Sequence, residues 1–191
     1  MPSAIEPGAT FSYAEARAAG WPKRRLYALR DSGDITAIGR GLYRWTDAPT
    51  TDLDLLEIAR RGPRATICLA SALARHDLTD ESPPRIDVAL PRTARLPRTA
   101  APVRWHRFAV DTFDLGRAVT DLSGAHIGLY SAERSIIDVF RLAHWEGADL
   151  ANEALRRWVR RRGANPATLL ELARHFPRVE GPIRRTLQIL L

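Results

Sequence analysis

The sequence predicts an α+β fold in two parts: a small N-terminal module, and a larger mixed α/β domain whose last part is helical. Three observations support this prediction. The first 48 residues hold two short helical segments followed by a glycine-centred hairpin. Short apolar segments typical of buried strands then alternate with helical segments to about residue 130. From residue 131 the apolar residues recur at helical spacing to the end of the chain.

Length and composition favour a cytoplasmic protein with a polyanionic partner. The 191 residues, 45% of them hydrophobic, suffice for one good core or two small ones. The single cysteine, Cys68, can form no internal disulfide, which fits a reducing compartment. The longest apolar stretch, residues 65–74, is far shorter than a membrane span, and residues 1–10 lack the pattern of a signal peptide. We therefore expect a soluble protein without membrane association, and the net charge of +7 favours a polyanion as partner.

The N-terminal segment predicts two helices joined by a tight turn. Ser12 and Glu15 match a capping box, in which each side chain accepts a hydrogen bond from a free amide at a helix start. A short helix over residues 13–19 follows. Pro22 suits the first position of a second helix over residues 22–31. This pair is a helix-turn-helix.

A hairpin follows the two helices. The segments 34–38 and 42–45 are β-prone, and Gly39-Arg40-Gly41 lies between them as a turn. Two helices, a turn and a hairpin in this order are the elements of a winged helix.

A polar, proline-containing stretch at residues 46–49 places the domain boundary. It gives a winged helix-turn-helix domain over residues 1–48 and an interaction domain over residues 49–191. We expect Thr51 to cap the next helix, over residues 51–61. We expect this helix to close the open side of the N-terminal module with three inward side chains, Leu53, Leu56 and Ala59.

Further elements of the second domain follow from periodicity and from turn residues. The expected strands cover residues 65–69, 85–90, 103–108 and 126–130, with an exposed loop over 91–102. The expected helices cover residues 70–76, 132–144, 150–162, 166–176 (capped by Asn165) and 182–191. Within the helix at 132–144, a spacing of four and three residues stacks Arg134, Asp138 and Arg141 on one face. A buried or half-buried ion-pair ladder explains this triplet better than a binding site.

The second N-terminal helix carries the candidate functional site. At 100° per residue, Pro22, Leu26 and Leu29 face inward, and basic residues flank this apolar stripe. Seven basic residues stand against two acidic ones between Arg17 and Arg44. The alternative is a solvated basic face on an ordinary helix, but the winged-helix order favours DNA. Arg24 and Tyr27 on the outward face would meet base edges, and the flanking Lys23, Arg25 and Arg30 would reach phosphates. The hairpin would add Arg40 and Arg44 as wing contacts. The predicted DNA-contacting residues are Arg17, Lys23, Arg24, Arg25, Tyr27, Arg30, Arg40 and Arg44.

Nothing in the sequence favours catalysis. The five histidines are scattered without a metal-ligand spacing, and no phosphate-binding glycine loop is present. Asp87 lies on a predicted strand but lacks the acidic-x-Lys partner of a nuclease site. A second basic cluster at residues 156–162 is at least as well explained by a solvated helix face. We therefore expect no catalytic residue, no metal and no cofactor.

The chain resembles the AbiEi-type antitoxins of bacterial type IV toxin–antitoxin systems, which are often described as transcriptional regulators. The resemblance rests on residues 14–20, 26–33, 39–44, 71–73 and 130–138. It implies a repressor that binds its own operator, which is double-stranded DNA. It also implies that the protein counters a nucleotidyltransferase-like toxin, directly or functionally. About ten residues precede the helix at 13–19, too few for the full first helix that normally backs the motif.

The second reading is an enzyme or orphan interaction domain whose winged helix is vestigial. Binding to the protein's own upstream DNA distinguishes the two readings.

Overall fold

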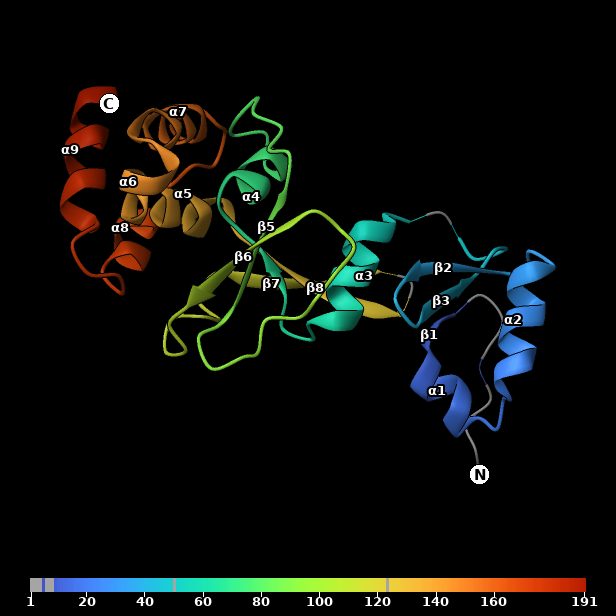
Figure 1. Ribbon diagram of the computed structural model, residues 1–191. Helices are drawn as coiled ribbons and strands as arrows, with labels where there is room; N and C mark the ends of the chain where they lie inside the picture. The colour runs from blue at the N-terminus through green and yellow to red at the C-terminus, as the bar shows by residue number, and fades with distance from the viewer. Residues whose placement is uncertain (1–4, 6–8, 50, 123) are drawn as a thin grey trace. The chain divides into compact units, whose positions relative to one another are not determined.

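The computed structural model describes residues 5, 9–49, 51–122 and 124–191. Residues 1–10, in which no signal peptide is expected, lie mostly outside this description. The fold is α+β, as predicted, with short helices and strands at the N-terminal end and helices at the C-terminal end (Figure 1). The chain divides into two compact units. The first comprises residues 1–63, 97–102 and 121–127, and the second comprises residues 64–96, 103–120 and 128–191.

The first unit contains a helix pair and a three-stranded antiparallel sheet of order β1-β3-β2. Its elements are β1 (Thr10–Ser12), α1 (Tyr13–Ala18), α2 (Lys23–Asp31), β2 (Ile35–Gly39), β3 (Leu42–Trp45) and α3 (Leu53–Arg61). The predicted helix pair and hairpin are confirmed. The strand β1 was not predicted, because three residues are too short to show an alternating pattern.

Local chemistry explains where the first two helices begin. Ser12 and Glu15 form the predicted capping box: the Glu15 amide donates to Ser12 Oγ at 3.1 Å, and the Ser12 amide donates to Glu15 Oε2 at 2.5 Å. Gly20, in the turn between the helices, has a φ of +80°. Pro22 is the N-cap residue of α2 rather than its first residue, and its side chain is exposed. The prediction that Pro22 packs inward is therefore wrong.

A small aromatic core holds the first unit together. It consists of Phe11, Ala16, Trp21, Leu26 and Ile35. The ring of Phe11 meets that of Trp21 edge-on at 5.5 Å between centroids, an orientation that aromatic pairs favour. Every element from β1 to β2 contributes one side chain to this core, so the two helices are fixed against the sheet.

Helix α3 also belongs to the first unit. Leu56 and Ala59 are buried, as expected. Leu53 is 44% exposed, so its expected inward position is wrong. The physical reason is the cap: Asp52, not Thr51, accepts a hydrogen bond from the Leu55 amide at 3.0 Å, and Leu53 is then the first residue of the helix.

The second unit contains most of a five-stranded mixed sheet and the C-terminal helices. Its sheet has the order β6-β5-β4-β8-β7, with β4 antiparallel to β5 and parallel to β8, and β5 parallel to β6. The strands are β4 (Thr66–Ile67), β5 (Ile86–Pro91), β6 (Val103–Phe108), β7 (Arg117–Leu122) and β8 (Ala125–Tyr130). The helices are α4 (Leu69–Arg75), α5 (Ala132–Arg141), α6 (Ala143–Glu146), α7 (Ala148–Val159), α8 (Pro166–Ala173) and α9 (Glu180–Leu190).

Most of these elements match the prediction, and the differences are local. Strand β7 was not predicted, because its residues are mostly exposed. The expected helix over 132–144 ends at Arg141, and Leu142 separates it from the short α6. Asn165 caps α8 as predicted, its Oδ1 accepting from the amide of Ala167 at 3.0 Å.

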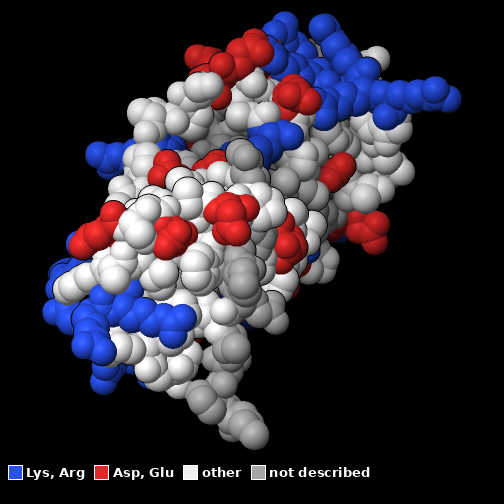
Figure 2. Space-filling view, turned by 90° about the vertical axis from the view of Figure 1, so that its right-hand side faces the viewer, with Lys and Arg blue, Asp and Glu red and all other residues white. Residues whose placement is uncertain are grey.

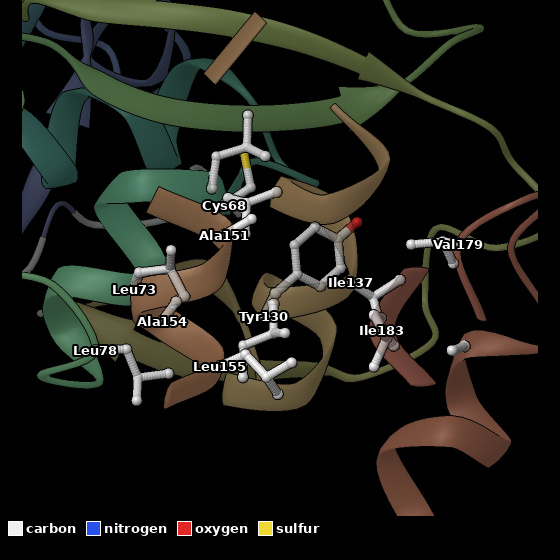
Figure 3. Packing of buried hydrophobic residues seen from close by; sticks show 14 of the residues in the cluster. Cys68, Leu73, Leu78, Tyr130, Ile137, Ala151, Ala154, Leu155, Val179 and Ile183 are labelled. Atoms are coloured by element: carbon white, nitrogen blue, oxygen red, sulfur yellow. The ribbon is translucent and has the colours of Figure 1, made fainter. Parts of the chain in front are cut away.

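The core of the second unit lies among its helices. Figure 3 shows Tyr130, Ile137, Leu155 and Ile183 in this cluster, which draws side chains from β8, α5, α7 and α9. Tyr130 also satisfies its own polar atom, because its hydroxyl donates to the Phe113 carbonyl at 2.8 Å.

The predicted ion-pair ladder is confirmed inside this core. Asp138, fully buried, accepts from Arg134 at 2.9 Å and from Arg141 at 2.8 Å. The Arg134 guanidinium lies 4.3 Å from the ring centroid of Tyr130 and 4.4 Å from that of Phe176. Because these contacts hold both charges inside the fold, the triplet is structural.

Candidate nucleic-acid interface

Helix α2 presents nearly all of its side chains to solvent. Leu26 is its one buried residue and anchors it in the aromatic core, while Leu29 is half-buried. The predicted outward residues Arg24 and Tyr27 are exposed, and so are the flanking Lys23, Arg25 and Arg30. A helix held by so few inward side chains leaves a basic surface open along its length.

Tyr27 lies at the centre of this surface and is 40% exposed. The Lys23 ammonium is 5.3 Å from its ring centroid and the Arg30 guanidinium is 5.0 Å from it. Hydrogen bonding with Tyr27 raises the pKa of Lys23 above its ordinary value. Two cations thus lie close to the Tyr27 ring, within the distance at which cation–π attraction acts.

Two further arginines of α2 differ in their freedom. The Arg25 guanidinium stacks 4.1 Å from the ring centroid of Trp21, which keeps it close to the turn between the helices. Arg30 pairs with Asp31 at 2.8 Å, and both side chains are exposed. Exposed pairs of this kind contribute little to stability, so Arg30 can exchange its partner for a phosphate at small cost.

The turn of the hairpin is held in place by its neighbours. Arg40 is exposed at this turn, and Gly41 has a φ of +67°. The Gly41 carbonyl accepts from the Tyr13 amide at 2.8 Å, and the Arg40 carbonyl accepts from the Arg61 guanidinium. The Arg40 side chain therefore projects from a fixed piece of backbone.

Arg44 does not lie where a wing contact requires. It is only 6% exposed, and its guanidinium donates to the Pro49 carbonyl. The reason is the alternation along β3: Tyr43 and Trp45 pack against the aromatic core, so Arg44 projects from the other face of the sheet, as Leu42 does, and both are buried there. Its expected exposure is wrong, and we exclude it from the interface. Arg17, on α1, is exposed as expected.

Residues of α3 that the sequence analysis did not single out support the helix pair and the hairpin turn. Arg60 donates to both carboxylate oxygens of Glu15, at 2.7 and 2.6 Å, and Glu15 is itself part of the capping box of α1. Arg60 and Arg61 in adjacent positions thus contact α1 and the hairpin turn. No sequence signal indicates these partners, because the contacts span 21 and 45 residues.

Figure 2 shows the basic side chains of one face gathered into groups, with acidic and uncharged side chains elsewhere on that face.

The second basic cluster, at residues 156–162, is largely committed to structural contacts. Arg156 and Arg157 pair with Glu153, Arg157 also pairs with Asp80, and Arg161 donates to the Asp77 carbonyl at 3.0 Å.

Other kinds of site find no support in the part of the chain that is described. It contains no group of three or more His, Cys, Asp or Glu side chains that could hold a metal ion. Among the described helices, none has the length and apolar character that crossing a bilayer requires. Asp87, considered above as a nuclease carboxylate, is buried and accepts from Arg104 at 2.5 Å and from His106 at 2.9 Å.

The fold and the α2 surface define an α+β protein whose N-terminal unit carries a helix-turn-helix with an exposed basic second helix. Residues 8–46, which cover this helix pair and the hairpin, match the family model described as "Transcriptional regulator, AbiEi antitoxin". This match confirms, over that segment, the resemblance noted from the sequence.

The solved structures that match the chain include one that is similar along most of its length. The crystal structure of the RV2827C protein from Mycobacterium tuberculosis has a TM-score of 0.52 at 20% identity, over 95% of this chain and 75% of that one. At this identity the similarity concerns the fold alone. No curated protein matches the chain.

Proposed function

We propose that the protein is a DNA-binding transcriptional autorepressor and the antitoxin of a type IV toxin–antitoxin system. Exposed basic residues flank Tyr27 on α2, the second helix of the helix-turn-helix, and this observation carries the DNA-binding part of the proposal. The regulator family matched by residues 8–46 supports the same role. Such a repressor works in the cytoplasm, where its operator would lie.

In this proposal α2 lies in the major groove of double-stranded operator DNA. Arg24 and Tyr27 contact base edges, and Lys23, Arg25 and Arg30 neutralise phosphates beside the groove. Arg40, on the hairpin turn, contacts the backbone or the minor groove, and Arg17 adds a phosphate contact. No catalytic residue is assigned.

The remaining part of the proposal concerns the division of labour. Residues 1–48 read the operator, with α3 supporting them. The second domain, within residues 49–191, deals with a nucleotidyltransferase-like toxin, either by binding it or by opposing its effect. The family name supports an antitoxin role.

The second reading, an enzyme or orphan interaction domain with a vestigial winged helix, predicts no preference for operator DNA. The discriminating experiment measures mobility shifts of the full chain on its own upstream DNA and on a scrambled duplex, at two salt concentrations. The proposal expects tighter binding to the upstream DNA and weaker binding at high salt, because bound phosphates release counterions. Equal binding to both duplexes, or none, would reject it. Co-expression with a nucleotidyltransferase-like toxin encoded beside this gene, if the neighbouring genes include one, tests the antitoxin part separately, with growth as the readout.

A further inference from the structure

A buried carboxylate on α3 ties a distant loop into the first unit. Glu57 is 2% exposed, and its Oε2 accepts hydrogen bonds from the backbone amides of Ala100 and Ala101, both at 2.9 Å. Residues 97–102 belong to the first unit although they are more than thirty residues beyond its N-terminal segment. These two hydrogen bonds from backbone amides explain how the loop is held, because a buried carboxylate needs such donors.

The other oxygen of the same carboxylate lies against the hairpin. A Cβ atom placed on Gly39 would lie 2.3 Å from Glu57 Oε1, so only glycine leaves room for the carboxylate. Strand β2 has an irregular register between Ala37 and Gly39, where the carboxylate approaches. Arg61, whose Nε is 3.7 Å from Glu57 Oε1, also donates to the carbonyl of Arg40. One buried side chain therefore joins the hairpin turn, α3 and the loop 97–102.

The loop brings a further cation to this part of the unit. Arg98 is exposed, and none of the ion pairs found among the described residues involves it. Within the loop 97–102 itself, Arg98 is the one charged residue, so no carboxylate of the loop repels a polyanion.

We propose that Arg98 is a further phosphate contact of the DNA interface and that Glu57 is the positioning residue that fixes its loop beside the hairpin turn. Arg40 is adjacent to Gly39, and Arg98 is two residues from Ala100, so the two cations project from backbone segments that touch one carboxylate. This inference rests on the proposed DNA-binding function. It adds to the helix-turn-helix a contact from a loop outside the segment that matches the regulator family.

The test compares Arg98→Ala with Arg185→Ala, which removes another exposed arginine, from α9 in the second unit. Binding of the full chain is measured on upstream and scrambled duplexes at two salt concentrations. The ratio of the affinities at about 50 and at about 200 mM salt measures how many phosphates are contacted. Loss of one phosphate contact should make this ratio about 3.5-fold smaller. Arg98→Ala should show this change equally on both duplexes, and Arg185→Ala should not.

The outcomes separate this inference from the proposed function. If the unsubstituted chain binds neither duplex, both fail. If Arg24→Ala weakens binding while Arg98→Ala behaves like Arg185→Ala, the inference alone is overturned and the proposed function stands.

The role of Glu57 is tested by coupling. In a Glu57→Ala background the loop loses the two hydrogen bonds that its backbone amides donate to Glu57. Adding Arg98→Ala to this background should then change affinity less than twofold, because the effects of independent contacts add and those of coupled contacts do not. Glu57→Gln keeps an oxygen acceptor and should restore the effect of Arg98→Ala; it also serves if Glu57→Ala fails to fold. An unchanged effect of Arg98→Ala in the Glu57→Ala background would show that Glu57 does not position the loop. If Glu57→Ala does not fold, Glu57→Gln replaces it as the background. If Ala100 and Ala101 then lose amide-exchange protection in Glu57→Gln, an unchanged effect of Arg98→Ala would show the same.

Discussion

Asp138 is the residue on which the buried charges of the second unit depend. It is fully buried and pairs with both Arg134 and Arg141. Asp138→Ala would leave two arginines without a carboxylate, and removing one partner of a buried pair costs about 3–5 kcal/mol. We expect a loss of this size in the free energy of unfolding, measured by urea denaturation.

The matched control is Glu153→Ala, which removes a partly exposed carboxylate that also pairs with two arginines, Arg156 and Arg157. This variant should lose clearly less stability than Asp138→Ala, since solvent screens such pairs. Similar losses in the two variants would contradict the structural role assigned to Asp138.

Asp87 makes the stability of the second unit depend on pH. Burial acts to raise the pKa of its carboxyl, but hydrogen bonds from His106 and Arg104 outweigh burial, so the pKa lies below its ordinary value. The ionised form therefore stabilises the fold at neutral pH, and this contribution is lost as the pH falls through the lowered pKa, below about 4.

The corresponding prediction uses Asp87→Asn. At pH 7 this variant should be less stable than the unsubstituted chain, and the difference should shrink as the pH falls below about 4. Urea denaturation at several pH values measures the difference. A difference that stays constant with pH would mean that ionisation of Asp87 does not stabilise the fold.

Residues were predictable from sequence where one helix decides their exposure. Arg24 and Tyr27 are exposed because the 3.6-residue period with Leu26 inward fixes their direction. Arg44 was not predictable, because its burial depends on contacts outside the hairpin, among them the Pro49 carbonyl that accepts from its guanidinium. The partners of Glu57 were equally hidden, since its amide donors follow 43 and 44 residues later.

At the scale of elements, α3 contributes buried side chains to the packing of the first unit. Leu56 is 0% exposed, whereas Leu53 on the same helix is 44% exposed. Leu56→Ala should lower the free energy of unfolding by about 2–5 kcal/mol, because it leaves a cavity in a closely packed region. Leu53→Ala, the matched control, should change it by less than about 0.5 kcal/mol.

Thermal and urea denaturation of both variants measure this difference. If Leu56→Ala and Leu53→Ala were equally stable, α3 would not contribute the packing assigned to it.

Elements with local signals were predicted well. The capping box of α1, the glycine-flanked hairpin and the Asn165 cap of α8 each lie within a few residues of the element that they define. Strands β1 and β7 lacked such signals, because one is three residues long and the other is mostly exposed. Their pairing depends on distant parts of the chain.

At the scale of the whole molecule, contacts rather than sequence order define the units. Two segments, 97–102 and 121–127, belong to the first unit although strands β4 and β5 of the second unit precede both of them in the sequence. A reading of the sequence from one end to the other places these segments in the later domain. The fold class was predictable because it depends on the order of elements, which the sequence does reveal.

The central claim is that α2 reads the sequence of the operator. Its most direct test is the ratio of the dissociation constants for scrambled and upstream duplexes, measured for the full chain, for Arg24→Ala, for Tyr27→Phe and for the control Arg185→Ala. A lost base contact is worth about 1–3 kcal/mol of discrimination. We expect the ratio to fall by about fivefold or more in Arg24→Ala, to fall in Tyr27→Phe, and to stay unchanged in Arg185→Ala. An Arg24→Ala variant that loses affinity equally for both duplexes would contradict the account.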